Sequence, residues 1–286
     1  MTTHAAAFDV ADALAVARRA IAEGREAATA VVVAASDGSL VGRRLAWDGT
    51  RHYGALGNPA SDSDARRLLE TAGRAPGRSQ LTAAGCHPIS GGIELYVERW
   101  VPQAELVIVG AGHIAQPLSL VGRLLDFRVS VIDDRPEFAT RERFPQADRV
   151  IVADFGDPLA GIDVGPRTSL VLVTRGHRHD YDCLRALARS GAKPAYVGMI
   201  GSRRRVRAAF EQLVAEGVEA SWLARIHAPL GLDIGAETPA EIAIAVGAEI
   251  VLAVRGGSGR PLAEGAAVLR HVKALAGAAP PGGRRP

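Results

Sequence analysis

A glycine-rich turn at residues 110–115 has the residue types and the spacing of a phosphate-binding loop. It has the pattern G-x-G-x-x-A, it follows the apolar run 106–109, and it opens an amphipathic stretch. In this setting Gly110 makes the tight turn, Gly112 lets the backbone approach a pyrophosphate, and the backbone amides through His113 face the anion. The turn predicts a nucleotide-like ligand, although a parallel sheet that binds nothing would also need small residues here.

Two acidic residues stand where such a ligand would present its ribose. Asp133 lies 21 residues after Gly112, at the end of the predicted strand 129–132, and Asp134 and Arg135 follow it. An acid in this position accepts hydrogen bonds from ribose hydroxyls and disfavours a 2′-phosphate. Arg135 could accommodate a 2′-phosphate, so NADP remains an alternative to NAD.

A second polar cluster, with two histidines, directly follows the predicted strand 170–173. His177 and His179 alternate, so both would face one side if this segment is extended, and Asp180 comes next. A metal needs three or four ligands, and no second His or Cys cluster lies nearby in the sequence, so we assign no metal site, although two Asp or Glu from other loops could complete one. We expect these side chains to contact a ligand. The alternative is that Asp180 caps the next helix and the histidines lie on the surface.

Two more loops that follow predicted strands carry polar residues. Gly201, Ser202 and Arg203 open the predicted helix 202–215, where free amides beside arginines favour an anion such as phosphate, or else form only a well-capped helix with a basic face. Asp233 and Glu237 lie in the glycine-rich segment before the predicted helix 239–254. Loops at the carboxyl ends of parallel strands line ligand sites, so these residues are candidates for the same site.

The composition excludes several classes of protein. The chain has 286 residues, a net charge of +3 and only two cysteines. Two cysteines cannot build a disulfide framework, and this small charge without a basic stripe does not predict a nucleic-acid partner. The most apolar stretch, 242–254, is shorter than the roughly 20 residues that span a bilayer. The first residues lack the layout of a signal peptide, so we expect a cytoplasmic protein.

The order of the elements predicts two domains. Residues 1–102 read as a small α+β unit, with helices at 9–23 and 63–72, a hairpin of 29–35 with 40–47, and a strand at 93–100. From 103 to 276, strands alternate with helices, which predicts a Rossmann-like, doubly wound parallel sheet of the α/β class. Within it we expect a short helix at 137–144, a last short strand at 225–227, and two closing helices at 239–254 and 262–274. The tail 277–286 is expected to be disordered.

Five stretches of the second half together resemble one protein family. They are VIVGAGHIAQPL (107–118), SVIDDRPEFATRERFPQAD (130–148), TRGHRHD (174–180), YVGMIGSRRR (196–205) and HAPLGLDIGAETPAEIA (227–243). In combination they are similar to the xanthine dehydrogenase accessory proteins, the XdhC/CoxI family. The resemblance covers about residues 105–260.

This resemblance implies a function as well as a fold. Proteins of this family combine an N-terminal α+β domain with a Rossmann domain and are commonly homodimers. They bind the molybdenum cofactor and help to load it, with its terminal sulfur, into molybdenum hydroxylases such as xanthine dehydrogenase. The implied partners are therefore the apo-hydroxylase and a sulfur-donating enzyme. The N-terminal third departs from the family pattern, because a family cysteine is missing from 54–59. If that cysteine contacts molybdenum or sulfur, the contact is lost or passes to Cys86, which we expect in a loop.

Three functions remain open from the sequence. In the first, the chain is a molybdenum-cofactor chaperone, with the cofactor at the amides of 110–113 and 201–203, its ribose at Asp133 if it is a dinucleotide, and the histidine cluster beside it. In the second, the chain is an NAD(P)-dependent oxidoreductase whose acid–base group is His177 or His179, because imidazole titrates near neutrality. In the third, it is a dinucleotide sensor without catalysis.

Overall fold

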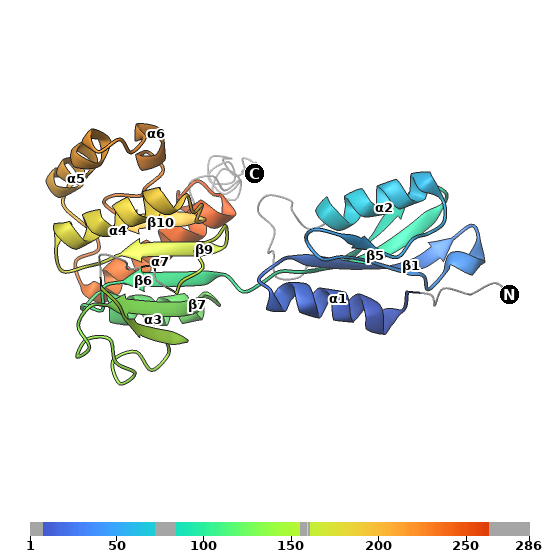
Figure 1. Ribbon diagram of the computed structural model, residues 1–286, viewed down its shortest axis with the longest axis horizontal. Helices are drawn as coiled ribbons and strands as arrows, with labels where there is room; N and C mark the ends of the chain where they lie inside the picture. Colours follow the sequence, from blue (N-terminus) through green and yellow to red (C-terminus); the bar gives the residue numbers. More distant parts are fainter. Residues whose placement is uncertain (1–7, 72–83, 155–158, 160, 263–286) are drawn as a thin grey trace, which may run out of the picture.

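The chain forms two separate five-stranded sheets, each covered by helices (Figure 1). The computed structural model describes residues 8–71, 84–154, 159 and 161–262. The chain leaves the first sheet after Trp100 and enters the second at Glu105. The α/β class and the two kinds of sheet are therefore as predicted, with the change of sheet on either side of Pro102.

The first sheet is antiparallel where its strands pair, with the order β3-β2-β1-β5-β4. Its strands are β1 (Ala27–Ala35), β2 (Arg44–Trp47), β3 (His52–Tyr53), β4 (Gly85–Ile89) and β5 (Ile93–Trp100). Helices α1 (Val10–Ala22) and α2 (Pro59–Thr71) cover its opposite faces (Figure 1). The predicted hairpin is confirmed as β1 with β2, and β5 alternates buried and half-buried residues as expected.

The second sheet is parallel, with the order β10-β9-β6-β7-β8. Its strands are β6 (Glu105–Val109), β7 (Arg128–Asp133), β8 (Arg149–Val152), β9 (Thr168–Leu172) and β10 (Tyr196–Met199). The order reverses between β6 and β9, because β7 and β8 continue to one side and β9 and β10 to the other. In open sheets of this kind, ligands bind beyond the carboxyl ends of the strands at such a switch point.

Helices cover both faces of the parallel sheet, as its fully buried strands β6 and β9 require. One core lies under α3 (Ala115–Leu124) and α7 (Pro239–Arg255), and the other lies under α4 (His177–Ser190), α5 (Arg203–Ala215) and α6 (Ala220–Leu223). Pro239 occupies the first position of α7, and Thr238 forms the predicted capping box with Glu241. Helices α3, α4 and α5 all begin at the carboxyl edge of the sheet.

Three local predictions are wrong. Residues 137–144 form turns instead of a helix; Pro145 disfavours a helical backbone at the preceding Phe144, and the guanidinium groups of Arg135 and Arg143 lie 3.6 and 4.7 Å from the Phe138 ring centre. Segment 225–227 forms only a single bridge, between His227 and Gly198. Cys86, expected in a loop, lies on strand β4. The helix and the tail predicted within 262–286 lie outside the described residues, apart from Leu262.

Candidate functional site

The two glycines of the loop after β6 have different roles. Gly110 has φ +107°, and a Cβ atom on it would lie 2.5 Å from the carbonyl oxygen of Val173 at the end of β9. A Cβ atom on Gly112 would meet nothing within 4 Å. Gly110 is thus required for the packing of the loop against β9, whereas the absence of a side chain at Gly112 leaves room beside the backbone.

The unpaired backbone amides of Gly112, His113 and Ile114 indicate an anion site. None of the three donates a hydrogen bond to a residue that the structure describes. They lie directly before α3, which begins at Ala115. Unpaired amides at a helix start carry a partial positive charge that stabilises a phosphate or a carboxylate. The open space at Gly112 lets a ligand reach them.

Asp133 is placed at the end of β7, as predicted, but its carboxylate is already occupied. It is 1% exposed, and it accepts hydrogen bonds from the amide of Ala111 at 2.7 Å and from the amide of Arg135 at 3.0 Å. The Arg135 side chain adds two more, from Nε at 2.9 Å and Nη2 at 3.1 Å. The carboxylate therefore fixes the glycine loop in place, and its contact with a ribose stays a prediction.

The neighbouring Asp134 forms an ion pair across the end of β6. Both guanidinium nitrogens of Arg175 donate to its carboxylate, one of them to Oδ2 at 2.7 Å. Asp134 follows β7 and Arg175 follows β9, and these strands flank β6 on its two sides. The ion pair therefore links the two segments on either side of the glycine loop.

This ion pair predicts an acid-dependent loss of stability. The hydrogen bond from Arg175 lowers the pKa of the Asp134 carboxyl from its ordinary 3.8 to about 2. A lowered pKa stabilises the fold above the unfolded value, and this contribution is lost as the pH falls from about 4 through 2. Because Asp134 is 24% and Arg175 40% exposed, we expect a contribution of only about 1 kcal/mol.

Urea unfolding of Asp134→Asn and of the unmodified protein between pH 2 and 6 measures this contribution. The difference in unfolding free energy should be near 1 kcal/mol at pH 6 and should vanish toward pH 2. Asp233→Asn is the matched control, because the Asp233 side chain is exposed and unpaired among the described residues. A pH-independent difference, or the same loss in the control, would contradict the assignment.

Arg143 contacts the glycine loop, and the sequence did not suggest this contact. Its Nη2 donates to the carbonyl oxygen of Ala111 at 3.0 Å, opposite the bond from the Ala111 amide to Asp133. Both backbone groups of Ala111 are therefore held by side chains. Arg143 lies in the segment expected to be helical, so no pattern in the sequence marked its role.

The histidine cluster differs from its prediction. His177, His179 and Asp180 lie in the first turn of α4, so the two histidines do not alternate along an extended loop. Asp180 is buried and accepts a hydrogen bond from the Thr174 hydroxyl at 2.7 Å, which fixes the turn between β9 and α4. The N-cap residue is Gly176 and not Asp180. The cluster still lies at the carboxyl edge of the sheet.

The remaining candidates lie around the end of β10. Ser202 is the N-cap of α5, where its hydroxyl accepts from the amide of Arg205 at 3.4 Å, and Arg203 begins the helix. Gly201 precedes them with φ +159°. The side chains of Asp233 and Glu237 are exposed and pair with no described residue. No described contact joins these two acids to the glycine loop, so their ligand contacts stay predictions.

The comparison with protein families now decides the relationship. The family model for the XdhC Rossmann domain matches residues 106–250, just over half of the chain. The chain belongs to the XdhC family. The matched region begins in β6 and ends within α7, so it contains the glycine loop, Asp133, Asp134 and helix α4.

Individual relatives agree with the XdhC assignment. The chain is 34% identical to the Escherichia coli protein YqeB over 162 residues, which cover 56% of this chain and 29% of that protein. It is 32% identical to a probable xanthine dehydrogenase subunit of Bacillus subtilis over 157 residues, or 55% of this chain and 45% of that one. The chain thus spans less than half the length of these curated relatives.

A solved structure shares the XdhC fold over most of this chain. The crystal structure of a xanthine dehydrogenase from Bacillus halodurans matches with a TM-score of 0.64 and 22% identity. The match covers 87% of this chain and 68% of that one, so it extends well beyond the Rossmann region. At 22% identity, this likeness is evidence for a shared fold alone.

The XdhC chain has two cysteines with opposite environments. Cys86 is exposed on β4, the outer strand of the first sheet. Cys183 is a core residue, buried in α4, and burial raises the pKa of its thiol. Within the described ranges, no group of three or more His, Cys, Asp and Glu residues could hold a metal ion, and no helix has the length and apolarity to cross a membrane.

Proposed function

We propose that this chain binds the molybdenum cofactor and delivers it to a molybdenum hydroxylase such as xanthine dehydrogenase. The observation that carries the proposal is the anion site at the glycine loop, in a chain of the XdhC family. Three amides without a described partner and an open approach at Gly112 lie at the switch point of the sheet. The cofactor is a cargo in this proposal, so the chain binds and releases it without a chemical step of its own.

The described residues fit a phosphorylated, polar cargo. A Cβ atom at Gly112 would occupy the space through which a phosphate reaches the amides, and the glycine leaves that space open. Ala111 is held rigidly on both of its backbone groups, so the loop is organised before a ligand arrives. A preorganised loop binds an anion without paying for its own ordering.

The names of the relatives support the choice of partner. The Bacillus subtilis relative is named as part of a probable xanthine dehydrogenase, and the Bacillus halodurans structure is described as a xanthine dehydrogenase. An apo-hydroxylase of this class is therefore the proposed recipient. A sulfur-donating enzyme as a second partner, a homodimer and a cytoplasmic location belong to the same proposal.

The experiment adds isolated molybdenum cofactor to the purified protein and separates the mixture by size exclusion. We expect molybdenum, measured by mass spectrometry, and pterin, measured by fluorescence after oxidation, to co-elute with the chain. The loaded chain should then restore the activity of apo-xanthine dehydrogenase faster than free cofactor does. Failure of both pterin and molybdenum to co-elute would refute the proposal.

A dinucleotide on the same loop is the second candidate function. The strand order of the parallel sheet, with the glycine loop after its central strand, favours it. Against it, the Asp133 carboxylate is buried and paired. A titration with NADH, followed by its fluorescence, separates the two: submicromolar binding with turnover of a substrate would favour an oxidoreductase, and binding without turnover would favour a sensor.

A further inference from the structure

Exposed apolar side chains gather on two neighbouring helices, α3 and α7, which pack over the same core of the parallel sheet. Among the described residues, these helices and the C-cap of α3 carry six large apolar side chains that are exposed to solvent. They form the α3–α7 surface, which consists of Leu120, Leu124, Leu125, Ile244, Val251 and Val254. Monomeric proteins rarely expose large contiguous apolar patches, so such a surface indicates a contact with another protein.

The α3–α7 surface is continuous across the two helices. A Cβ atom on Gly247 of α7 would lie 2.5 Å from Cγ1 of Val121 and 3.6 Å from Cδ1 of Leu125, so the helices approach closely at this point. One turn further along α7, Val251 and Val254 line the same depression as Leu125. The exposed side chains of the two helices therefore belong to one face of the molecule.

Helix α7 has no polar side to present to water. The only charged residue within 242–254 is Glu249, whose side chain is 12% exposed. Its carboxylate accepts hydrogen bonds from the Tyr196 hydroxyl at 2.5 Å and from the Gly231 amide at 2.8 Å, so it is used inside the molecule. A helix that is apolar on every side is typical of a position that protein covers on every side.

The absence of outward charge on this surface suits a second copy of the chain. In a two-fold contact the same patch of both copies meets, so a charged patch would repel its own copy. The segment 242–254 presents no outward charge, and the charge of Arg123 on α3 is paired with Asp148 at 3.1 Å. The α3–α7 surface is therefore complementary to itself.

The size of the surface suits a dimer of moderate affinity. Helices of 10 and 17 residues are about 15 and 25 Å long, and each is about 10 Å wide. Side by side they present about 400 Å² in projection, or about 800 Å² for two copies, and the accessible area of such an uneven face is larger. A specific interface needs roughly 1,000 Å² in total, so we expect association in the micromolar range.

We propose that two copies of the chain associate through the α3–α7 surface, with α3 and α7 of one copy against α3 and α7 of the other. The contact forms a layer of four helices between the two parallel sheets. This inference rests on the proposed function in so far as that function includes a homodimer, and it names the surface that the two copies share.

The test is sedimentation velocity of the full chain between about 1 and 200 µM. The variants Leu120→Glu and Val251→Glu each place a charge within the α3–α7 surface, one on each helix. Leu14→Glu is the matched control, because Leu14 also lies on the outer side of a helix, α1, and is 47% exposed where Leu120 is 50% exposed. Circular dichroism melting curves check that all three variants stay folded.

We expect a dimer with a micromolar dissociation constant, which Leu120→Glu and Val251→Glu each weaken by about 100-fold or more, because an unpaired charge is buried in both copies. The Leu14→Glu control should dimerise as the unmodified chain does. A monomer at about 200 µM would overturn the proposal, whether residues 263–286 or another protein then covers the surface. Equal weakening in the control, or a dimer that neither surface variant weakens, would also overturn it.

Co-elution of the molybdenum cofactor, measured on the unmodified chain, separates this inference from the proposed delivery. A dimer that depends on Leu120 and Val251 but binds no cofactor would support the contact and refute the delivery. A monomer that binds the cofactor would overturn the contact and leave the delivery standing.

Discussion

Replacing Gly112 by valine is expected to abolish binding of the molybdenum cofactor while the protein stays folded. The Cβ atom of the new side chain enters open space, and Gly112 does not have the positive φ that excludes side chains. The valine would instead stand between the ligand and the amides of Gly112, His113 and Ile114. We expect a loss of affinity of about 100-fold or more, because the close approach of the phosphate is blocked.

Co-elution of the cofactor measures the loss of binding, and a circular dichroism melting curve shows whether the variant stays folded. Gly165→Val is the matched control, since a Cβ atom there also meets nothing within 4 Å and Gly165 precedes β9, at the opposite edge of the sheet. The control should retain the cofactor. Undiminished binding in Gly112→Val would place the cargo elsewhere on the chain.

Replacing Gly110 by alanine is expected to destabilise the protein strongly. The new Cβ atom would lie 2.5 Å from the Val173 carbonyl oxygen and 2.9 Å from the Cα atom of Thr174, and both are backbone atoms that cannot rotate away. The φ of +107° adds strain for any residue with a side chain. Together these effects should lower the free energy of unfolding by about 3 kcal/mol or more.

Urea unfolding of Gly110→Ala, with Gly112→Ala as its control, measures this difference. The two substitutions add the same methyl group two residues apart, so their comparison isolates the packing against β9. We expect Gly112→Ala to change stability by less than about 1 kcal/mol, because its methyl group meets no atom. A similar midpoint for both variants would show that the loop moves to accommodate the methyl group at Gly110.

The sequence predicted the sheets well because hydrophobic patterning reflects burial directly. The apolar run 106–109 became the fully buried β6, and the alternation at 93–100 became β5. The patterning failed in a short segment next to proline. Residues 137–144 have the composition of a short helix, but Pro145 disfavours a helical backbone at Phe144, and the segment forms turns.

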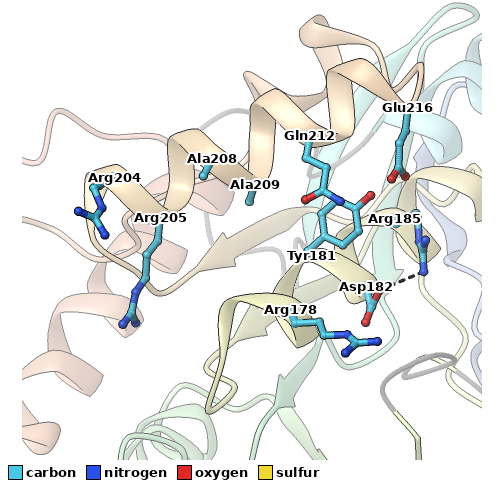
Figure 2. Close-up of a pocket in the computed structure, with 10 residues that line it drawn as sticks. All are labelled: Arg178, Tyr181, Asp182, Arg185, Arg204, Arg205, Ala208, Ala209, Gln212 and Glu216. Atoms are coloured by element: carbon cyan, nitrogen blue, oxygen red, sulfur yellow. Dashed lines mark hydrogen bonds and ion pairs between the residues drawn. The ribbon is translucent and has the colours of Figure 1, made fainter.

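The positions of the candidate residues were predicted better than their contacts. Asp133 could be placed at the carboxyl edge of the sheet because it ends a predicted strand. Only the structure shows that its carboxylate accepts hydrogen bonds from the Ala111 amide and the Arg135 side chain. The link between Asp134 and Arg175 joins residues 41 positions apart, which no local pattern reveals. A pocket between α4 and α5, lined by Tyr181 and four arginines (Figure 2), depends on two helices lying side by side, so the sequence could not indicate it.

The segment at His227, which forms one bridge in place of the expected strand, has a consequence for association between molecules. It donates to the Val197 carbonyl and accepts from the Met199 amide, both at 2.9 Å, and the Leu230 amide donates to the Met199 carbonyl at 3.1 Å. The outer side of β10 is thereby occupied from the Val197 carbonyl to the Met199 carbonyl. A strand with an unpaired outer side is a template for aggregation through added strands. The segment thus blocks that edge of the parallel sheet against a strand from another molecule.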